Sequence, residues 1–373
     1  MKLRDFNVED IQGKIDYLIN EEYHLLTLEE GLTPKDYFVF ISNLSSICHH
    51  TALSFAMHLY TLWGLKLLLP DRKKVNKYIN SVLNEGSLLA SLNEPGLYFV
   101  SPDKLREKDF NIIASPVKGG YILNGVKNFI SMEPLVTYLP MYCRIENYQE
   151  KDHGIIVVIV NKNTQGINIK KNWDSISMEH TESNSVELNN VFVSSEDVLL
   201  MPSTSISQTD LFGYLFRLSI SSVYYGIAKS ATEYIKNHTV KHKVPHFDKP
   251  LAFFPGSQYS IAEMIIKLET SYSQIIQLCE ALQSVMDTPI SYESKKEIKK
   301  ISLITKEYST QSAKEIVDTG LKIVGVKSLS KKNYLSELYK DVIAGQFHPP
   351  QRDIAYELLA KDFVGILPWK NRW

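Results

Sequence analysis

The chain has 373 residues, a formal net charge of −1 at pH 7 and 44% hydrophobic residues. This length allows two or three packed units, and the hydrophobic content excludes a largely disordered chain. The near-zero net charge gives no electrostatic basis for binding nucleic acid. The three cysteines are scattered along the chain, which fits buried thiols in a reducing compartment, so we expect a cytoplasmic protein without disulfides.

The N-terminal part is predicted to be helical over residues 6–84, because apolar residues recur there at helical spacing. Residues 51–65 contain no Asp, Glu, Lys or Arg and are rich in apolar side chains. This run is shorter than the ~20 residues that a membrane-spanning helix needs, so we expect a buried core helix. His49 and His50 are neighbours whose side chains are expected to diverge on a helix, so no metal site is predicted.

Between residues 86 and 200 the apolar period shortens to that of β-strands, with Gly, Pro, Asn and Ser between the segments. About seven or eight strands are predicted, enough for a small antiparallel barrel or a two-layer sandwich. Asn124-Gly125 is a strong tight-turn dipeptide, because both residues tolerate positive φ. Residues 119–131 are therefore predicted to form a hairpin that turns at Asn124-Gly125, and residues 89–96 a further strand.

After Pro202 the pattern is helical to the end of the chain. The predicted helices cover residues 209–241, 257–285, 291–324, 331–344 and 351–364. Long helices joined by short loops indicate an up-down four-helix bundle. The predicted domains are a helical unit at 1–85, a β unit at 86–202 and the bundle at 203–373. A homodimer or homotetramer built through the bundle is expected, because residues 215–227 carry more apolar positions than one helix face buries.

The order of these segments resembles the acyl-CoA dehydrogenase family across nearly the whole chain. That family has a hydroxyl residue before Glu-Pro-Gly, where this chain has Asn93 before Glu94-Pro95-Gly96. Its Asn-Gly-x-Lys-x-Trp-Ile-Thr segment has a counterpart in residues 124–131, and its Ser-Asn/Asp-Thr strand one in residues 183–185. The resemblance implies FAD, with FMN as the alternative, between the β unit and the bundle.

The resemblance also implies a set of flavin contacts. Leu92 and Asn93 occupy the pair that meets the flavin, Phe129 replaces the tryptophan that stacks on the ring, and Ser131 replaces the threonine that reaches N5. Phe129 has ordinary core packing as its alternative role, and Ser131 a strand-end cap. The motif that grips the partner subunit's FAD pyrophosphate has lost its arginine and glycine, which leaves His242 and Lys243 to supply positive charge.

Desaturation of an acyl thioester needs a base at the α-carbon, and most of the family uses a glutamate in a turn between the last helices. Pro349 stands at that position, and Phe216 stands at the minority position directly before Arg217. His348 is the nearest titratable residue and is the candidate base, with a turn cap as its alternative role. Arg217 is a candidate for binding the phosphates of CoA, with a solvent-exposed helix arginine as its alternative.

Three functional hypotheses follow. The first is an FAD-dependent oxidoreductase of the acyl-CoA dehydrogenase type, which oxidises an acyl thioester of CoA or a carrier protein and passes electrons to a partner protein or oxygen. The second is a monooxygenase or oxidase on the same scaffold, which the missing carboxylate favours. The third is a non-catalytic protein, which the eroded phosphate-side motifs favour. The fold alone does not choose among them.

Overall fold

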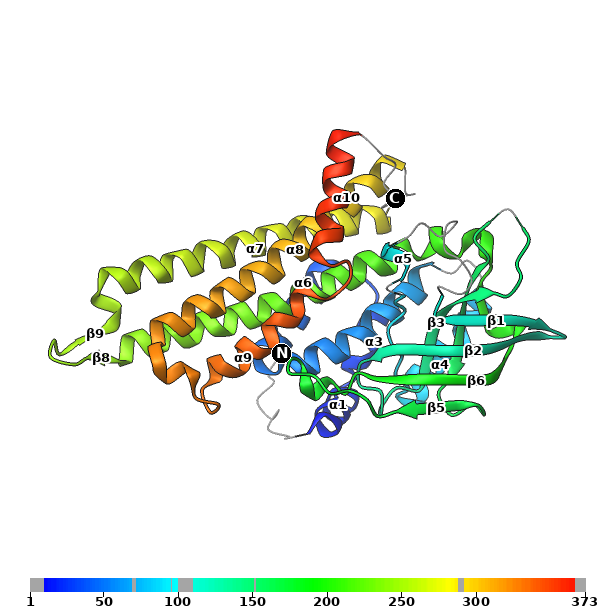
Figure 1. Ribbon diagram of the computed structural model, residues 1–373, viewed down its shortest axis with the longest axis horizontal. Helices are drawn as coiled ribbons and strands as arrows, with labels where there is room; N and C mark the ends of the chain where they lie inside the picture. The colour runs from blue at the N-terminus through cyan, green and yellow to red at the C-terminus, as the bar shows by residue number, and fades with distance from the viewer. Residues whose placement is uncertain are drawn as a thin grey trace.

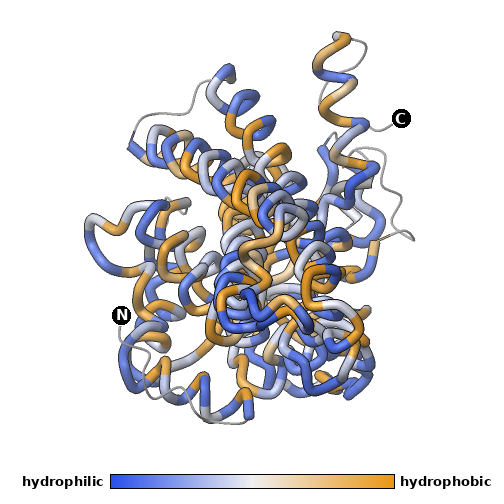
Figure 2. Tube along the Cα trace, turned by 90° about the vertical axis from the view of Figure 1, so that its left-hand side faces the viewer, coloured by the Kyte–Doolittle hydropathy of each residue, from blue (hydrophilic) through white to orange (hydrophobic). Residues whose placement is uncertain are grey.

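The computed structural model describes residues 10–68, 72–94, 96–99, 110–150, 152–287 and 292–365. Helices come first, a β-sheet follows, and long helices form the C-terminal part (Figure 1). The predicted order of helical, β and helical segments is confirmed. Residues 6–9 of the first predicted helical stretch lie outside the described residues. Hydrophobic stretches gather toward the middle of the molecule, where the helices pack together (Figure 2).

The helices before the sheet are α1 Ile11–Asn20, α2 Pro34–Ile47, α3 His49–Leu68, α4 Arg72–Glu85 and the short α5 Gly96–Phe99. A 3-10 helix at Tyr23–Leu28 connects α1 to α2. Thr33 begins α2 with a capping box, because its hydroxyl accepts from the Asp36 amide at 3.1 Å while the Asp36 carboxylate accepts from the Thr33 amide at 3.1 Å. Pro34 then supplies a favourable first residue.

α3 is buried along the whole of residues 51–65, which confirms the predicted core helix. None of the described helices is long and apolar enough to cross a membrane. Cys143 and Cys279 are buried, Cys48 is partly buried, and none of the three forms a disulfide, as predicted.

The central unit is a seven-stranded sheet in the order β5-β6-β2-β1-β3-β4-β7. Its strands are β1 Ile112–Val117, β2 Gly120–Ile130, β3 Tyr138–Ile145, β4 Ile155–Asn161, β5 Ile167–Lys170, β6 Asn184–Ser194 and β7 Val198–Leu200. β1 and β3 pair in parallel and the other neighbours are antiparallel. The predicted antiparallel barrel or sandwich is therefore wrong. The sheet is mixed and open, because β3 pairs with the edge of β1 that β2 leaves free. The prediction failed because the apolar period of a strand does not indicate whether its neighbour runs parallel or antiparallel.

The position of the predicted hairpin turn is also wrong. β1 and β2 form the hairpin, and their last pair, Val117 with Gly120, places the turn at Lys118 and Gly119. β2 continues through Asn124 without reversing. The hairpin of this part of the chain therefore lies one strand earlier than the Asn-Gly dipeptide indicated.

Asn124 and Gly125 instead form an irregularity within β2, where its pairing with β6 shifts register. Gly125 has φ +143°, and a Cβ there would collide with the carbonyl oxygen of Asn111, so the position requires glycine. The Asn124 side chain accepts from the amide of Asn190 on β6 at 2.8 Å. The dipeptide marks a backbone that needs positive φ, and a bulge meets that need as well as a turn does.

Residues 89–94 are not a strand of the sheet, contrary to prediction. Leu89 makes an isolated bridge to Tyr138, and side chains of α3 bind the rest of the segment. The Leu89 amide donates to His58 Nδ1 at 3.0 Å, and the Leu92 carbonyl accepts from the Tyr60 hydroxyl at 3.3 Å. Because α3 supplies these partners, the backbone is satisfied without a neighbouring strand.

The C-terminal helices are α6 Pro202–Lys241, α7 Pro255–Asp287, α8 Tyr292–Val324, α9 Tyr334–Val342 and α10 Arg352–Val364. α6, α7 and α8 run side by side, and α2 and α3 pack against α6, so N-terminal helices complete the bundle (Figure 1). The apolar row at Leu215, Leu218, Ile220, Val223 and Ile227 is fully buried within this one chain. That row therefore gives no argument for an oligomer, and the oligomeric state stays a prediction.

Candidate functional site

A cavity of about 180 Å³ opens where residues 93–94 meet the sheet. Its lining residues are Asn93, Glu94, Asn111, Ile112, Lys127, Asn128, Phe129, Met141 and Tyr142. Two of the predicted flavin contacts, Asn93 and Phe129, therefore lie in one cavity wall. The Asn93 side chain makes no hydrogen bond to any described residue, so its amide is available to a ligand. Leu92, the residue before Asn93, has its side chain buried in the core and does not line the cavity.

Phe129 has the backbone and exposure of a ligand-contacting residue. Its φ is +57°, and its side chain is 63% exposed. The ring meets Trp173 edge-on with the ring centroids 6.5 Å apart. A bulky residue in this backbone region costs on the order of 1–3 kcal/mol, and such strain gathers at functional sites. The alternative role of Phe129 in core packing is excluded by its exposure.

Ser131 begins a chain of hydroxyl groups. The Ser183 hydroxyl donates to Ser131 Oγ at 3.1 Å and lies 2.8 Å from the Thr181 hydroxyl. Thr181 in turn donates to the carbonyl of Met178 at 2.8 Å. The proton of Ser131 therefore has no acceptor among the described residues and is free to donate to a ligand.

Glu94 and Lys127 form a buried charged pair in the cavity wall that the sequence motifs did not identify as functional. Lys127 Nζ donates to the Ser91 carbonyl at 3.0 Å, and Glu94 Oε1 accepts from the Asn111 amide at 2.8 Å and the Gly96 amide at 3.1 Å. Burial lowers the pKa of Lys127 to about 8 and raises the pKa of Glu94, while each charge opposes the shift of the other. Both residues belong to family motifs, Glu94 to Glu-Pro-Gly and Lys127 to Asn-Gly-x-Lys, and these motifs were the sequence signal that could have identified them.

We expect Lys127→Met to lower the free energy of unfolding by roughly 2 kcal/mol, because Glu94 would remain buried without its nearby cation. Glu94 keeps two N–H donors, which limits the loss. Urea unfolding of Lys127→Met, Glu94→Gln and the double variant measures the coupling. The double variant should lose less stability than the two single variants added together, and additive losses would show that the two charges do not interact.

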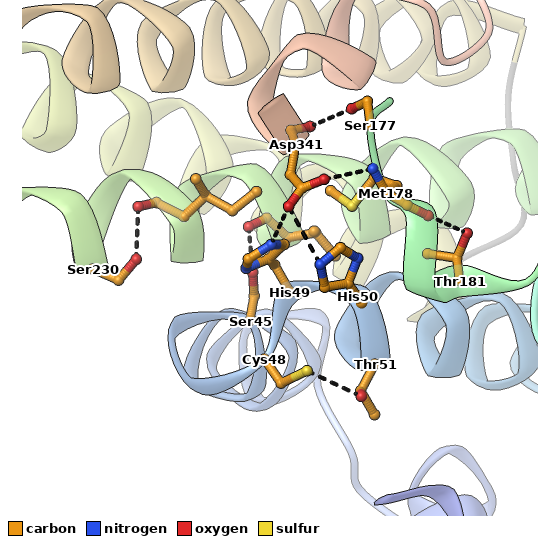
Figure 3. Close-up of polar contacts among 12 residues, drawn as sticks. Ser45, Cys48, His49, His50, Thr51, Ser177, Met178, Thr181, Ser230 and Asp341 are labelled. Carbon is orange, nitrogen blue, oxygen red and sulfur yellow. Dashed lines mark hydrogen bonds and ion pairs between the residues drawn. The ribbon is translucent and has the colours of Figure 1, made fainter. Parts of the chain in front are cut away.

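Asp341 of α9 binds both His49 and His50, which corrects the expectation that the two side chains diverge. Asp341 Oδ2 lies 2.8 Å from His49 Nε2 and 3.3 Å from His50 Nε2, and Oδ1 accepts from the Met178 amide at 2.5 Å (Figure 3). Side chains lean toward the N-terminal end of their helix, and these two begin α3. Both rings therefore reach past the helix end to the same carboxylate.

This cluster joins the bundle to the sheet. The Met178 carbonyl accepts a hydrogen bond from the Thr181 hydroxyl, and the Met178 amide donates one to Asp341. The chain of hydroxyl groups that begins at Ser131 is therefore connected to Asp341 through Met178. Candidate ligand atoms of His49, His50, Glu337 and Asp341 lie within 4.8 Å of one another, as a metal site would need. The contacts of Asp341 with His49, His50 and the Met178 amide hold α3, α9 and the segment before β6 together.

His348 is partly buried, and its Nε2 lies 3.0 Å from the Tyr224 hydroxyl of α6. Burial, with a smaller contribution from the nearby Lys306, lowers the pKa of His348 to about 3. The side chain is therefore neutral at pH 7. In this state it can form hydrogen bonds, but it is a poor proton acceptor. Its role as a base stays a prediction that these surroundings do not favour.

Arg217 is buried, not solvent-exposed as its alternative role required, and its Nε donates to Ser302 on α8 at 2.9 Å. Phe216 beside it is buried against Tyr60 of α3, with the ring centroids 5.6 Å apart. Phe216 and Pro349, the residues predicted to stand at the two base positions, carry no carboxylate, and the assignment of these positions stays a prediction.

His242 and Lys243 lie at the end of the bundle opposite the sheet, next to the small hairpin of β8 Lys243–Val244 and β9 Lys249–Pro250 (Figure 1). His242 stacks on His238 with centroids 5.0 Å apart, and Lys243 Nζ lies 2.6 Å from Asp248 Oδ1. The role of His242 and Lys243 at the cofactor of a partner subunit stays a prediction.

The chain is similar to proteins with different flavin chemistries. It is 24% identical to YdbM of Bacillus subtilis (strain 168), a provisionally assigned acyl-CoA dehydrogenase, over 95% of this chain and 91% of the relative. It is 23% identical to the dibenzothiophene monooxygenase of Mycolicibacterium goodii over 65% of this chain and 61% of that relative. The FMN-bound structure of TdsC from Paenibacillus sp. A11-2 matches with a TM-score of 0.83 and 17% identity, over 97% of this chain and 93% of that chain, which shows a shared fold.

Family models extend this similarity to named domains. The acyl-CoA dehydrogenase middle domain matches residues 107–191, which hold most of the sheet. The acyl-CoA dehydrogenase C-terminal domain matches residues 214–360, which hold most of the bundle. Together the two models cover more than half of the sequence, and their order agrees with the order of sheet and bundle in the structure. The chain belongs to the acyl-CoA dehydrogenase family.

Proposed function

We propose that this protein is a flavin-dependent monooxygenase on the acyl-CoA dehydrogenase scaffold, with FMN or FAD as its cofactor. The observation that carries the proposal is that no competent base stands at or beside the two predicted base positions. Phe216 and Pro349 cannot ionise, and the neighbouring His348 is neutral at pH 7. Removal of an α-proton from a thioester needs a competent base, whereas oxygen transfer from a reduced flavin has no such requirement at this place.

The residues at the sheet fit a flavin ring. Phe129 offers an exposed aromatic face, Ser131 an unused hydroxyl proton, and Asn93 an unused amide, all of which suit a flat group with several hydrogen-bonding atoms. A bound flavin would supply the electron transfer and, with oxygen, the oxidising power. The chain would hold the ring with Phe129, donate to it from Ser131 and orient Ser131 through Ser183. The neutral His348 and Tyr224 would close the opposite side.

Acyl-CoA dehydrogenase activity is the second candidate. The similarity to YdbM favours it, because that similarity covers 95% of this chain. The base would then be an unassigned group, and electrons would pass to a separate electron-transfer protein. Arg217 would bind the phosphates of CoA from inside the bundle.

Oxygen-isotope incorporation distinguishes the two candidates. The protein is loaded with FMN or FAD, reduced without air and then mixed with ¹⁸O₂ and either indole, dibenzothiophene or an aromatic carboxylate. A monooxygenase gives a product that carries ¹⁸O. A short-chain acyl-CoA added without air to the oxidised form should leave the flavin absorbance unchanged. Rapid bleaching by the acyl-CoA, with no labelled product from any probe, would contradict the monooxygenase proposal.

We further propose a homodimer built through the bundle end that carries β8, β9 and the start of α7. Large apolar side chains are exposed there, namely Phe247, Phe253, Tyr259, Ile265 and Ile266. Apolar patches of this kind mark interaction surfaces. His242 and Lys243 lie beside the patch, which would bring them to the partner's cofactor. Sedimentation equilibrium should give a multiple of the 42.7 kDa chain mass, and Phe253→Asp should shift the protein toward the single-chain mass.

A further inference from the structure

A polar strip runs through the interface between α6 and α8. Arg217 and Tyr224 are seven residues apart on α6 and share a face, as do Ser302 and Lys306, four residues apart on α8. The hydrogen bond from Arg217 Nε to Ser302 Oγ joins the two faces at 2.9 Å. Arg217 is 4% exposed and Lys306 is fully buried. Two cations therefore lie inside the bundle.

These two cations are short of partners. Lys306 Nζ donates to one acceptor, the carbonyl of Pro350 at 3.1 Å, although an ammonium group has three protons. Arg217 makes the one bond to Ser302 and rests 5.3 Å from the centre of the Tyr214 ring. Within the described part of the chain, neither cation forms an ion pair with a carboxylate. Among the described residues, each of the two cations therefore has one hydrogen-bond acceptor.

Neighbouring polar side chains do not supply further hydrogen-bond acceptors to Arg217 and Lys306. Glu307 follows Lys306 on α8, but its Oε1 lies 3.4 Å from Arg352 Nε and its Oε2 is buried without a hydrogen-bond partner. Ser221, one turn along α6 from Arg217, also has a buried hydroxyl without a partner. Unsatisfied buried groups are rare in folded proteins, and the Ser221 hydroxyl is one that could donate to an anion.

The electrostatics agree with a missing negative charge. Burial lowers the pKa of Lys306 to about 8, with Glu307 opposing this shift and Arg217 adding to it. A buried cation without a counter-charge is costly, and a second cation nearby adds to that cost. An anion between the two would remove the repulsion and supply acceptors for the idle donors.

The two cations adjoin the proposed reaction site. Pro350, which accepts from Lys306, belongs to the turn that replaces the base turn of the family. Phe216 packs on Tyr60, whose hydroxyl binds the Leu92 carbonyl at the edge of the sheet cavity. Lys306 thus contacts the turn directly, and Arg217 follows in α6 the residue that packs on Tyr60.

We propose that the substrate of this protein carries an oxyanion, a carboxylate or equivalent acid group, that Arg217 and Lys306 bind together. The identification of this ligand as the substrate rests on the proposed monooxygenase function. The binding of the oxyanion itself needs no flavin. A protein that fails to bind FMN and FAD would overturn the proposed function and leave the test below intact.

Matched acids and amides test the proposal on the full chain, with and without FMN. Acetate, benzoate and 2-naphthoate are each compared with the corresponding amide by calorimetry and by the shift in unfolding midpoint. At pH 7 we expect at least one acid to bind on the order of 10-fold or more tightly than its amide. Lys306→Met should weaken the binding of that acid on the order of 10- to 100-fold and leave the binding of the amide unchanged.

Lys300→Met is the matched control, because Lys300 is an exposed lysine of the same helix that pairs with Glu297. It should bind acids like the parent protein. Lys306→Met should unfold at the same or a higher temperature, since it removes a buried cation that forms no ion pair with a described carboxylate.

A pH series provides a readout that needs no variant. The groups that act electrostatically on Lys306 are Arg217 of α6, Glu307 of α8 and His348 of the turn. His348 stays neutral between pH 7 and 9.5, because burial lowers its pKa to about 3. The preference for acid over amide should therefore fall across this range as Lys306 loses its proton, and Lys306→Met should not show the fall.

Several results would overturn the proposal. These are equal affinity for all three acids and their amides, an acid preference that is constant from pH 7 to 9.5, or the same preference in Lys306→Met and the parent. Binding of CoA that depends on Lys306, without binding of any small acid, would likewise overturn it and assign the oxyanion to the phosphates of CoA.

Discussion

Pro349→Glu is expected to confer acyl-CoA oxidation on this protein, which we propose to be a monooxygenase. The substitution restores a carboxylate at the position where most of the family carries its base, and a positioned base contributes on the order of 10²–10⁴ in rate. Lys306 binds the next carbonyl of the same turn, so it would lower the pKa of the new carboxylate and keep the gain near the lower end of that range. Bleaching of the flavin by a short-chain acyl-CoA without air is the measurement.

Pro349→Gln is the matched control, because it makes the same change of shape without a charge. It should bleach as slowly as the parent. Rapid bleaching of the parent protein itself would show that a base already exists, and His348→Gln would then identify it. If His348 is that base, His348→Gln keeps the flavin bound but slows the reaction on the order of 10²–10⁴. Given the low pKa of His348, we expect no such loss.

Asp341→Asn is expected to lower the free energy of unfolding by roughly 3–5 kcal/mol, because it removes a buried charge that receives several hydrogen bonds. The carboxylate binds two imidazoles of α3 and the Met178 amide, and so joins three distant segments of the chain. Urea unfolding measures the loss. Asp174→Asn, which changes an exposed carboxylate outside this cluster, is the control and should change stability by less than about 0.5 kcal/mol.

The stability difference between the parent and Asp341→Asn should depend on pH. Burial alone would raise the pKa of Asp341, but the bonds from His49 and His50 more than reverse this and hold the pKa well below its usual range. A carboxyl group with a depressed pKa in the folded state stabilises the fold above its unfolded pKa of ~4 and loses that contribution as pH falls. The two proteins should therefore converge in stability as pH falls below ~4. A difference that is constant from pH 7 to pH 3 would contradict this account.

Local patterns in the sequence were sufficient for the order of elements and for the family. The uncharged apolar run at residues 51–65 predicted the buried helix α3, and the change of period after Pro202 predicted α6, α7 and α8. These predictions succeed because helical and strand periodicities follow from which face of an element is buried. The motif residues around Glu94 and Lys127 identified the family before any geometry was known.

Contacts between distant segments account for what the sequence did not predict. Asn124-Gly125 needs positive φ, but the close approach of the Asn111 carbonyl makes it a bulge and not a turn. The segment from Leu89 to Glu94 is apolar like a strand, yet the polar side chains of α3 satisfy its backbone in place of a neighbouring strand.

The same reason applies to the side chains of the site. His49 and His50 converge because Asp341, nearly three hundred residues later, lies over the start of α3. In the sequence, Arg217 and Lys306 look like ordinary charged residues of two helices. They are buried together because α6 packs on α8. Burial and the charge of distant neighbours set the chemistry of such groups, and neither quantity is encoded within a few residues of the group itself.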